Sequence, residues 1–173
     1  MSIAQSMLAE FEGQVPITRR FLERVPEDRL TWKPHEKSMT AGQLAFHLAF
    51  VPGGVIQFVQ NSPAPAPDFA SFPQPASKQE ILNKFDESIA TVRDLLPKLD
   101  DAKMQETWRM VQGDKEVLAV PRAQFIRDIM LNHWYQHRGQ FCVYLRLLHV
   151  AVPASWGPSA DEPPAFQQMA RSA

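Results

Sequence analysis

Residues 121–148 have the sequence PRAQFIRDIMLNHWYQHRGQFCVYLRLL, which contains the longest helical pattern in the chain. Apolar residues and histidines recur in it at every third or fourth position: Phe125, Ile129, His133, His137, Phe141, Leu145 and Leu148. A row with this spacing lies on one face of an α-helix. Pro121 suits the first helical position, because the N–H that it lacks would have no intrahelical partner there. The sequence therefore predicts one helix over 121–148, roughly 40 Å long at about 1.5 Å per residue.

Three earlier segments show the same helical period, over residues 3–25, 40–61 and 77–96. The second and third begin with the spacings Thr40-x-x-Gln43 and Ser77-x-x-Glu80, which are typical of a capping box. In this motif two side chains satisfy backbone N–H groups that the first helical turn leaves without partners. Pro97 ends the third segment, because proline cannot continue a helix.

Proline also indicates where helices end or bend. Pro16 lies inside the first segment and Pro52-Gly53-Gly54 inside the second, so we expect a kink or a break at both places. Nine of the 15 prolines fall in two windows, 63–75 and 153–164. We interpret these windows as connectors, because each proline also pushes its predecessor toward extended geometry.

The segment between the third and fourth helices, residues 107–120, has two short β-capable runs around Gln112-Gly113-Asp114-Lys115. It predicts a short hairpin or an extended excursion, and an ordered loop is the alternative. Four amphipathic helices in a small chain bury their apolar rows against one another. We therefore predict an all-α fold, a four-helix bundle, as a single domain over residues 1–164, with a mobile tail over 165–173.

The composition argues against several function classes. The 173 residues include 18 Lys and Arg against 19 Asp and Glu, for a net charge of −1, and nucleic-acid binders usually have a basic excess. There is no apolar run of about 18 residues and no basic and apolar leader, so we expect no membrane contact, no secretion and a cytoplasmic location. The single cysteine, Cys142, excludes an internal disulfide and fits a reducing compartment.

Histidine placement is the remaining chemical signal, since the chain has no GxGxxG, GxxxxGK[ST], HExxH, CxxC or Glu-x-x-His motif. His133 and His137 are four residues apart, so their imidazoles lie on one helix face and can converge on one cation. His47 interrupts the apolar row of the second helix in the same way. One shared divalent metal would satisfy all three rings and leave a position for water or substrate. The alternative is three separate buried histidines, each with its own hydrogen-bond partner.

The other histidines have structural interpretations. His35 lies in a loop, and His149 lies at a helix C-terminus, where a histidine either adopts the left-handed conformation or interacts favourably with the helix dipole. Gln43 lies one turn before the histidine of the second helix, and Gln140 lies three residues after the second histidine of the pair. Either glutamine could fix the tautomer of its neighbouring histidine.

A longer set of residues extends this pattern. It runs through Trp32-Lys33-Pro34, Ser38-Met39-Thr40, Gln43-Leu44-x-x-His47, His133-x-x-x-His137-Arg138-Gly139-Gln140, Tyr144-Leu145-Arg146, Val152-Pro153 and Trp156-Gly157-Pro158-Ser159-Ala160-Asp161-Glu162. In these motifs the chain resembles the DinB-like family, from about residue 8 to residue 164. The resemblance implies a four-helix bundle in which His47, His133 and His137 bind one divalent metal, usually nickel or zinc. Two positions depart from the family: Gln136 stands where a histidine is frequent, and His149 where glycine is frequent.

The resemblance also implies a function. Characterised members join low-molecular-weight thiols to electrophiles or act on the conjugates, so we expect a metal-dependent transferase or hydrolase with a small-molecule substrate. It further implies a homodimer. One alternative is a non-catalytic metal-binding or dimerising stress-response module. Another is a haem held between His47 and a histidine of the fourth helix.

Overall fold

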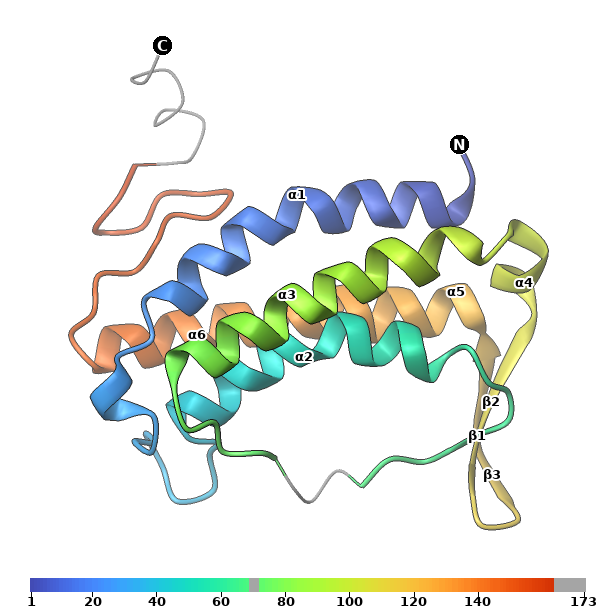
Figure 1. Ribbon diagram of the computed structural model, residues 1–173, viewed down its shortest axis with the longest axis horizontal. Coiled ribbons are helices and arrows are strands. Elements are labelled where there is room, and N and C mark those ends of the chain that lie inside the picture. Colours follow the sequence, from blue (N-terminus) through green and yellow to red (C-terminus); the bar gives the residue numbers. More distant parts are fainter. Residues whose placement is uncertain (69–71, 164–173) are drawn as a thin grey trace.

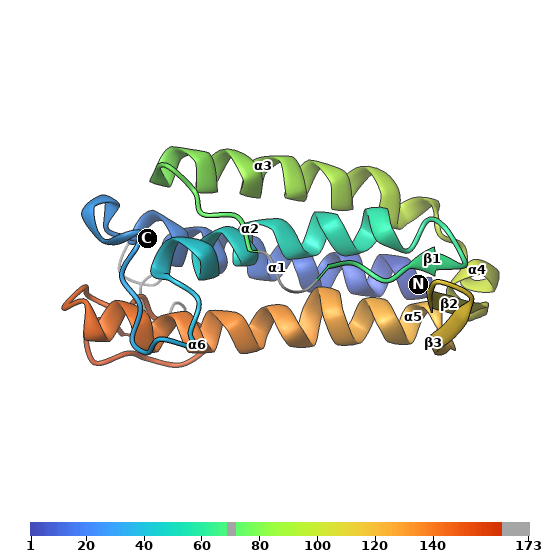
Figure 2. The same ribbon diagram turned by 90° about the horizontal axis from the view of Figure 1, so that it is seen from below.

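The computed structural model describes residues 1–68 and 72–163, in which four long helical elements lie side by side (Figure 1). They are α1 (Ile3–Glu23), α2 (Ala41–Phe58), α3 (Lys78–Leu95), and a last element made of α5 (Arg122–Phe125), η3 (Ile126–His133) and α6 (Trp134–Leu147). Helix α2 packs against α3 and the last element, and α1 packs against α3 and α6 (Figure 2). In the described part of the chain, no helix is long and apolar enough to cross a membrane. The predicted tail, 165–173, lies outside the described residues.

A small sheet at one end of the bundle corrects the all-α prediction. The strands are β1 (Ala64–Pro65), β2 (Thr107–Gln112) and β3 (Lys115–Pro121), in the order β1-β2-β3, with the first pair parallel and the second antiparallel. The hairpin expected around residues 112–115 is confirmed, and Gly113 adopts a φ of 59°, which glycine reaches without steric cost. Strand β1 was missed because it lies in a proline-rich window predicted to be a connector. It is an edge strand, where a proline without an N–H is tolerated.

The shorter helical elements complete the chain order: η1 (Glu27–Arg29), η2 (Leu96–Lys98) and α4 (Asp101–Gln105). The second proline-rich window has no helix or strand over 153–163, as expected for a connector. Glu162 within it forms ion pairs with Arg20 and Arg24 of α1, which ties this segment to the bundle.

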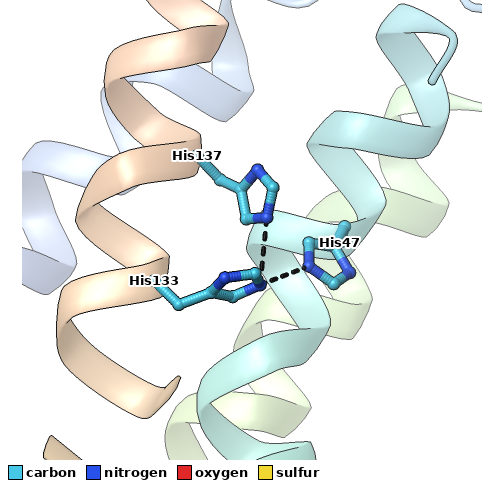
Figure 3. Close-up of side chains that lie close together, drawn as sticks. All are labelled: His47, His133 and His137. Atoms are coloured by element: carbon cyan, nitrogen blue, oxygen red, sulfur yellow. Dashed lines mark hydrogen bonds between the residues drawn. The ribbon is translucent and has the colours of Figure 1, made fainter. Parts of the chain in front are cut away.

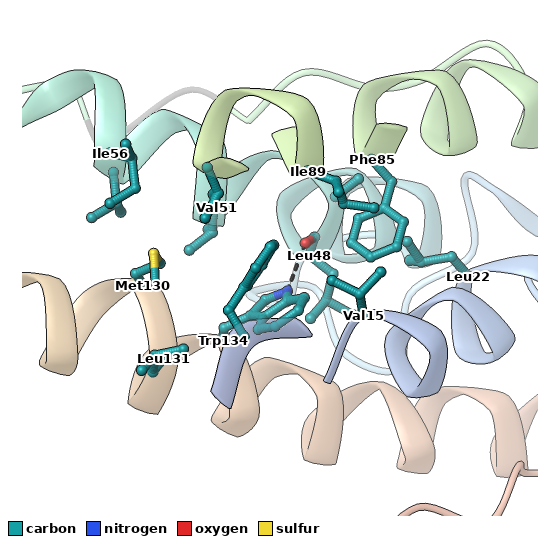
Figure 4. Packing of buried hydrophobic residues seen from close by; sticks show 14 of the residues in the cluster. Val15, Leu22, Leu48, Val51, Ile56, Phe85, Ile89, Met130, Leu131 and Trp134 are labelled. Atoms are coloured by element: carbon teal, nitrogen blue, oxygen red, sulfur yellow. Dashed lines mark hydrogen bonds between the residues drawn. The ribbon is translucent and has the colours of Figure 1, made fainter. Parts of the chain in front are cut away.

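The core is filled from all four long elements. Figure 4 shows Val15 and Leu22 of α1, Leu48, Val51 and Ile56 of α2, Phe85 and Ile89 of α3, and Met130, Leu131 and Trp134 of the last element. The capping box predicted at the start of α2 is confirmed: Thr40 Oγ1 accepts from the Gln43 N–H, and the Gln43 side chain accepts from the Thr40 N–H. At α3 only half of the motif forms, because the Glu80 carboxylate accepts from Ala76 instead of Ser77.

Pro16 and Pro52 do not break their helices, and for Pro52 the packing gives the reason. Proline cannot donate to the carbonyl four residues earlier. The Leu48 carbonyl accepts instead from Trp134 Nε1, 2.8 Å away, and the next backbone N–H, of Gly53, donates to Ser88 Oγ at 2.7 Å. Neighbouring helices therefore satisfy the backbone groups that Pro52 affects, and α2 continues to Phe58. Around Pro16, α1 also continues, and Figure 1 shows its axis bending.

Candidate metal centre

Three histidines from two helices meet between α2 and the last long element. His47 projects from α2, while His133 and His137 project from the end of η3 and from α6 (Figure 3). The Nε2 atom of His133 lies 3.1 Å from Nε2 of His47 and 3.0 Å from Nε2 of His137. Each ring offers a nitrogen that lies within 4.8 Å of the other two. The structure thus brings together the three residues that the sequence singled out.

A π-helical segment positions His133. The sequence predicted an unbroken α-helix over 121–148, but η3 (Ile126–His133) is π-helical, and Pro121 ends β3 and caps α5 instead of occupying the first helical position. In the first half of this element the fully buried positions are Ile126, Met130 and Trp134, one residue later than predicted, whereas Phe141 and Leu145 of the predicted row are buried as expected. Phe125, Ile129 and His133 are only half-buried. His133 and His47 are half-buried at the margin of the core, whereas His137 is buried, and π-helical turns are frequent at functional sites.

Burial keeps the three imidazoles neutral. It lowers the pKa of His47 to about 4, with smaller contributions in the same direction from His137 and His133. Burial likewise lowers the pKa of His133 and of His137. A neutral imidazole is the form that binds a metal, so the cluster has its ligands deprotonated at neutral pH.

One contact fixes the tautomer of His137. Its Nδ1 lies 2.9 Å from Oε1 of Gln140, and because that oxygen only accepts, the ring proton is on Nδ1. The Nε2 atom of His137 then presents a lone pair toward His133 (Figure 3). This is the role that the sequence analysis allowed for Gln140, and it matches how outer residues orient metal-binding histidines.

The donor set fits a divalent transition metal. Each neutral ring carries one N–H, and that of His137 is directed to Gln140, so its Nε2 offers a lone pair beside the Nε2 atoms of His133 and His47. Histidine nitrogens bind zinc at about 2.0–2.1 Å, which places two ligands about 3.3 Å apart in a tetrahedral site and about 2.9 Å apart at right angles. The separations from His133 to the other two rings, 3.0 and 3.1 Å, lie between these values. Imidazole donors suit zinc and nickel alike.

An aromatic residue that the sequence analysis missed lies beside the cluster. The Phe72 ring packs edge-on against His47, with ring centroids 5.5 Å apart and planes at 83°. Gln43, considered above as a tautomer-fixing partner, instead donates from Nε2 to the Phe72 carbonyl at 3.0 Å. No sequence pattern linked Phe72 to His47, because the segment between α2 and α3 returns to the site only through the fold.

The other histidines have the structural roles that were expected. His35 Nδ1 accepts from the Lys37 N–H in a turn, and His149 follows α6 with a φ of 59°, the left-handed conformation of a helix end. Cys142 is half-buried, and its thiol donates to the Arg138 carbonyl. Within residues 1–68 and 72–163, the histidines of Figure 3 form the one metal-sized cluster of histidine, cysteine or carboxylate side chains.

Comparisons with known proteins agree with this arrangement. The sequence profile of the DinB superfamily matches residues 10–141, a range that contains all three histidines. YrdA, an uncharacterised protein of Bacillus subtilis, is 26% identical over 157 residues, which cover 90% of this chain and 89% of YrdA.

Two solved structures have the same fold. A DinB-like protein from Bacillus cereus matches with a TM-score of 0.68 at 19% identity, over 87% of this chain and 96% of that one. The DinB-like protein YjoA from Bacillus subtilis matches with a TM-score of 0.61 at 18% identity, over 86% and 95%.

Proposed function

Because the chain belongs to the DinB superfamily, we propose that it binds one divalent transition metal ion, nickel or zinc, through Nε2 of His47, His133 and His137. The observation that carries this proposal is the convergence of three neutral imidazoles at about the spacing that one ion requires. Separate structural histidines would each direct both ring nitrogens to partners of their own, whereas here Gln140 contacts only Nδ1 of His137 and the three Nε2 atoms lie close to one another.

We further propose a metal-dependent transferase or hydrolase that acts on a small molecule, such as a low-molecular-weight thiol. Three protein ligands leave open coordination positions, and a bound metal ion lowers the pKa of a thiol or a water molecule that occupies one. The residues of this chain would hold and orient the ion. Gln140 keeps the His137 lone pair directed inward, and Phe72 provides an apolar wall beside His47.

A non-catalytic metal-binding module is the second candidate. It is favoured by the same Phe72 ring, because packing against His47 reduces the room for a substrate on that side. Cobalt substitution separates the two candidates. A spectrum that changes when a thiol is added indicates an exchangeable position and supports the enzyme, and an unchanged spectrum supports the binding module.

Elemental analysis of the untagged protein tests the metal proposal itself. We expect about one equivalent of metal in the wild type and loss of metal from both His47→Ala and His133→Ala. His35→Ala is the matched control, because it removes a histidine from a turn outside the cluster and should leave the metal content unchanged. Metal-free wild type that takes up neither nickel nor zinc would contradict the proposal.

The homodimer is part of the same proposal. Family resemblance is its support, and sedimentation equilibrium tests it. A mass near twice 19.6 kDa is expected, and a monomer mass at all concentrations would contradict it.

A further inference from the structure

A second candidate site lies at the end of the bundle that carries the sheet. A cavity of about 660 Å³ opens there, and its lining includes Ser62 just beyond α2, Lys103 of α4, Arg109 of β2 and Arg122 of α5. Figures 1 and 2 both place α4, α5 and the strands together at this end. Phe58, the last residue of α2, comes 11 positions after His47, or about 16 Å along the helix. The cavity is therefore separate from the histidine cluster.

Arg122 is held rigidly in the wall of this cavity. Its side chain is only 8% exposed, and Nε donates to the Val59 carbonyl at 3.1 Å. Nη1 donates to the Lys103 carbonyl at 2.5 Å and to the Glu106 carboxylate at 3.1 Å. Nη2 has no partner among the described residues, and every fully buried side-chain nitrogen there has one, so Nη2 retains some exposure while Arg122 lines the cavity. Because Nε and Nη1 donate to protein acceptors, the donor that remains for a ligand is the Nη2 amino group, which these bonds hold in place.

The cavity also has an excess of positive charge. Lys103, Arg109 and Arg122 line it, against the single carboxylate of Glu106. The Lys103 ammonium has no ion-pair partner among the described residues, and Arg109 is paired with Glu116 through one nitrogen only. The whole chain has a net charge of −1, so this local excess does not reflect a generally basic protein.

A hydroxyl adds a further donor. Ser62 Oγ accepts the backbone N–H of Arg109 at 3.0 Å, which leaves its O–H available to donate to a ligand. The pairing of β1 with β2 and the bond from Trp108 Nε1 to the Asn61 carbonyl hold this part of the wall in place. The donors around the cavity are therefore arranged before any ligand arrives.

We propose that this cavity binds a small organic molecule through an anionic oxygen group, a carboxylate or a phosphate. Arg122 supplies oriented donors of the kind that recognise such groups, and Lys103 and Arg109 supply charge. The volume lies within the range of about 300–1,000 Å³ that is typical of small-molecule sites, so there is room for the rest of the ligand. Binding here requires neither the histidines nor a metal.

Calorimetric titration of the full-length protein at low ionic strength tests this proposal, with inorganic phosphate and succinate as probes. We expect saturable binding of at least one probe with a Kd of about 1 mM or lower. Lys103→Gln and Arg109→Gln should each weaken binding by about fivefold or more. Lys115→Gln is the matched control, because it removes one positive charge from the same hairpin outside the lining. His47→Ala should bind the probes like the wild type.

The outcomes separate the ligand sources. Binding of succinate alone indicates a carboxylate, binding of phosphate alone indicates a phosphate ester, and binding of both fits either. Failure of both probes to saturate by about 20 mM would overturn the proposal. An equal loss of probe affinity in Lys115→Gln and in Lys103→Gln would also overturn the proposal, because it would reflect general attraction by charge. Arg122 is left intact in this test, since it also joins α2 to α4.

Discussion

The last long helix has two polar faces that differ in how their polar atoms are satisfied. Toward α1, Tyr135 Oη donates to Glu10 Oε1 at 2.8 Å, and Arg127 donates to the other oxygen of the same carboxylate at 2.6 Å. Toward α2, His133 and His137 have each other and His47 as neighbours. The face toward α1 is a hydrogen-bonded network, whereas on the face toward α2 three imidazole nitrogens lie close to one another. Hydrogen-bonded networks stabilise a fold, and clustered imidazole nitrogens are suited to binding a cation.

The buried arginine on the α1 face illustrates the contrast. Arg138 is 8% exposed, donates to Thr18 Oγ1 at 3.1 Å and lies 5.4 Å from the centre of the Tyr135 ring. Burial lowers the pKa of Arg138 and raises the pKa of Tyr135, the latter with help from the hydrogen bond to Glu10. The two faces should therefore respond differently to mutation, one through metal content and the other through stability.

His133→Ala should have the largest effect on the α2 face, because His133 Nε2 contacts both other rings. We expect metal affinity to fall by more than the roughly 10–100-fold typical of losing an outer-shell partner. Competition with a chromogenic chelator measures this. Since bound metal stabilises the folded state by mass action, the variant should also lose the rise in melting temperature on adding metal. A full rise in His133→Ala would mean that the metal binds elsewhere.

Gln140→Leu should have the next largest effect, because it removes the acceptor that keeps the His137 proton on Nδ1. A loss of about 10–100-fold in metal affinity is expected, by the same chelator competition. Gln140→Glu retains an acceptor oxygen at this position and should restore most of the affinity. Equal losses in the two variants would show that the glutamine acts by packing alone.

The two faces can also be compared in metal-free protein, through the pH dependence of stability. The pKa of His47 is about 4 when folded, against an ordinary value of 6.5. Between these values the unfolded chain binds more protons, so the free energy of unfolding falls as pH drops through this range. Urea denaturation of protein freed of metal by a chelator, from about pH 7 to about pH 4.5, measures how the free energy of unfolding changes with pH. His47→Gln should flatten this dependence, and an unchanged slope would place the titrating groups elsewhere.

Tyr135→Phe should have the smallest effect and only on the α1 face. Loss of the hydrogen bond to Glu10 is expected to cost about 1 kcal/mol of stability. Urea denaturation measures this, and elemental analysis should find the metal content unchanged. A drop in metal content with little change in stability would show that the two faces are coupled.

The sequence predicted most of the helical framework, and two kinds of feature were beyond it. Helical period and capping motifs located the long helices, and the turn residues around Gly113 located the hairpin. The π-helical turns of η3 were missed because a row of apolar residues at every third or fourth position does not distinguish the backbone hydrogen bonds of an α-helix from those of a π-helix. Strand β1 was missed because its pairing with β2 joins segments more than 40 residues apart.

The candidate site was predicted to a similar extent. The spacing of four residues predicted that His133 and His137 act together, and the place of His47 in an apolar row made it a candidate. The family resemblance assigned all three to one metal site. Gln140 could be proposed because it lies on the same helix as His137. Phe72 could not, because its contact with His47 depends on how the connector returns to α2.

Pro52 has a consequence for how the two halves of the site find their alignment. Pro52 cannot donate to the Leu48 carbonyl, which accepts from the indole of Trp134, and Trp134 directly follows His133 in the chain. Sliding one helix along the other by a turn would leave a buried carbonyl and a buried indole N–H without partners. Pro52 thus helps to fix the relative position of α2 and the last helix along their axes, and in that position the three imidazoles meet.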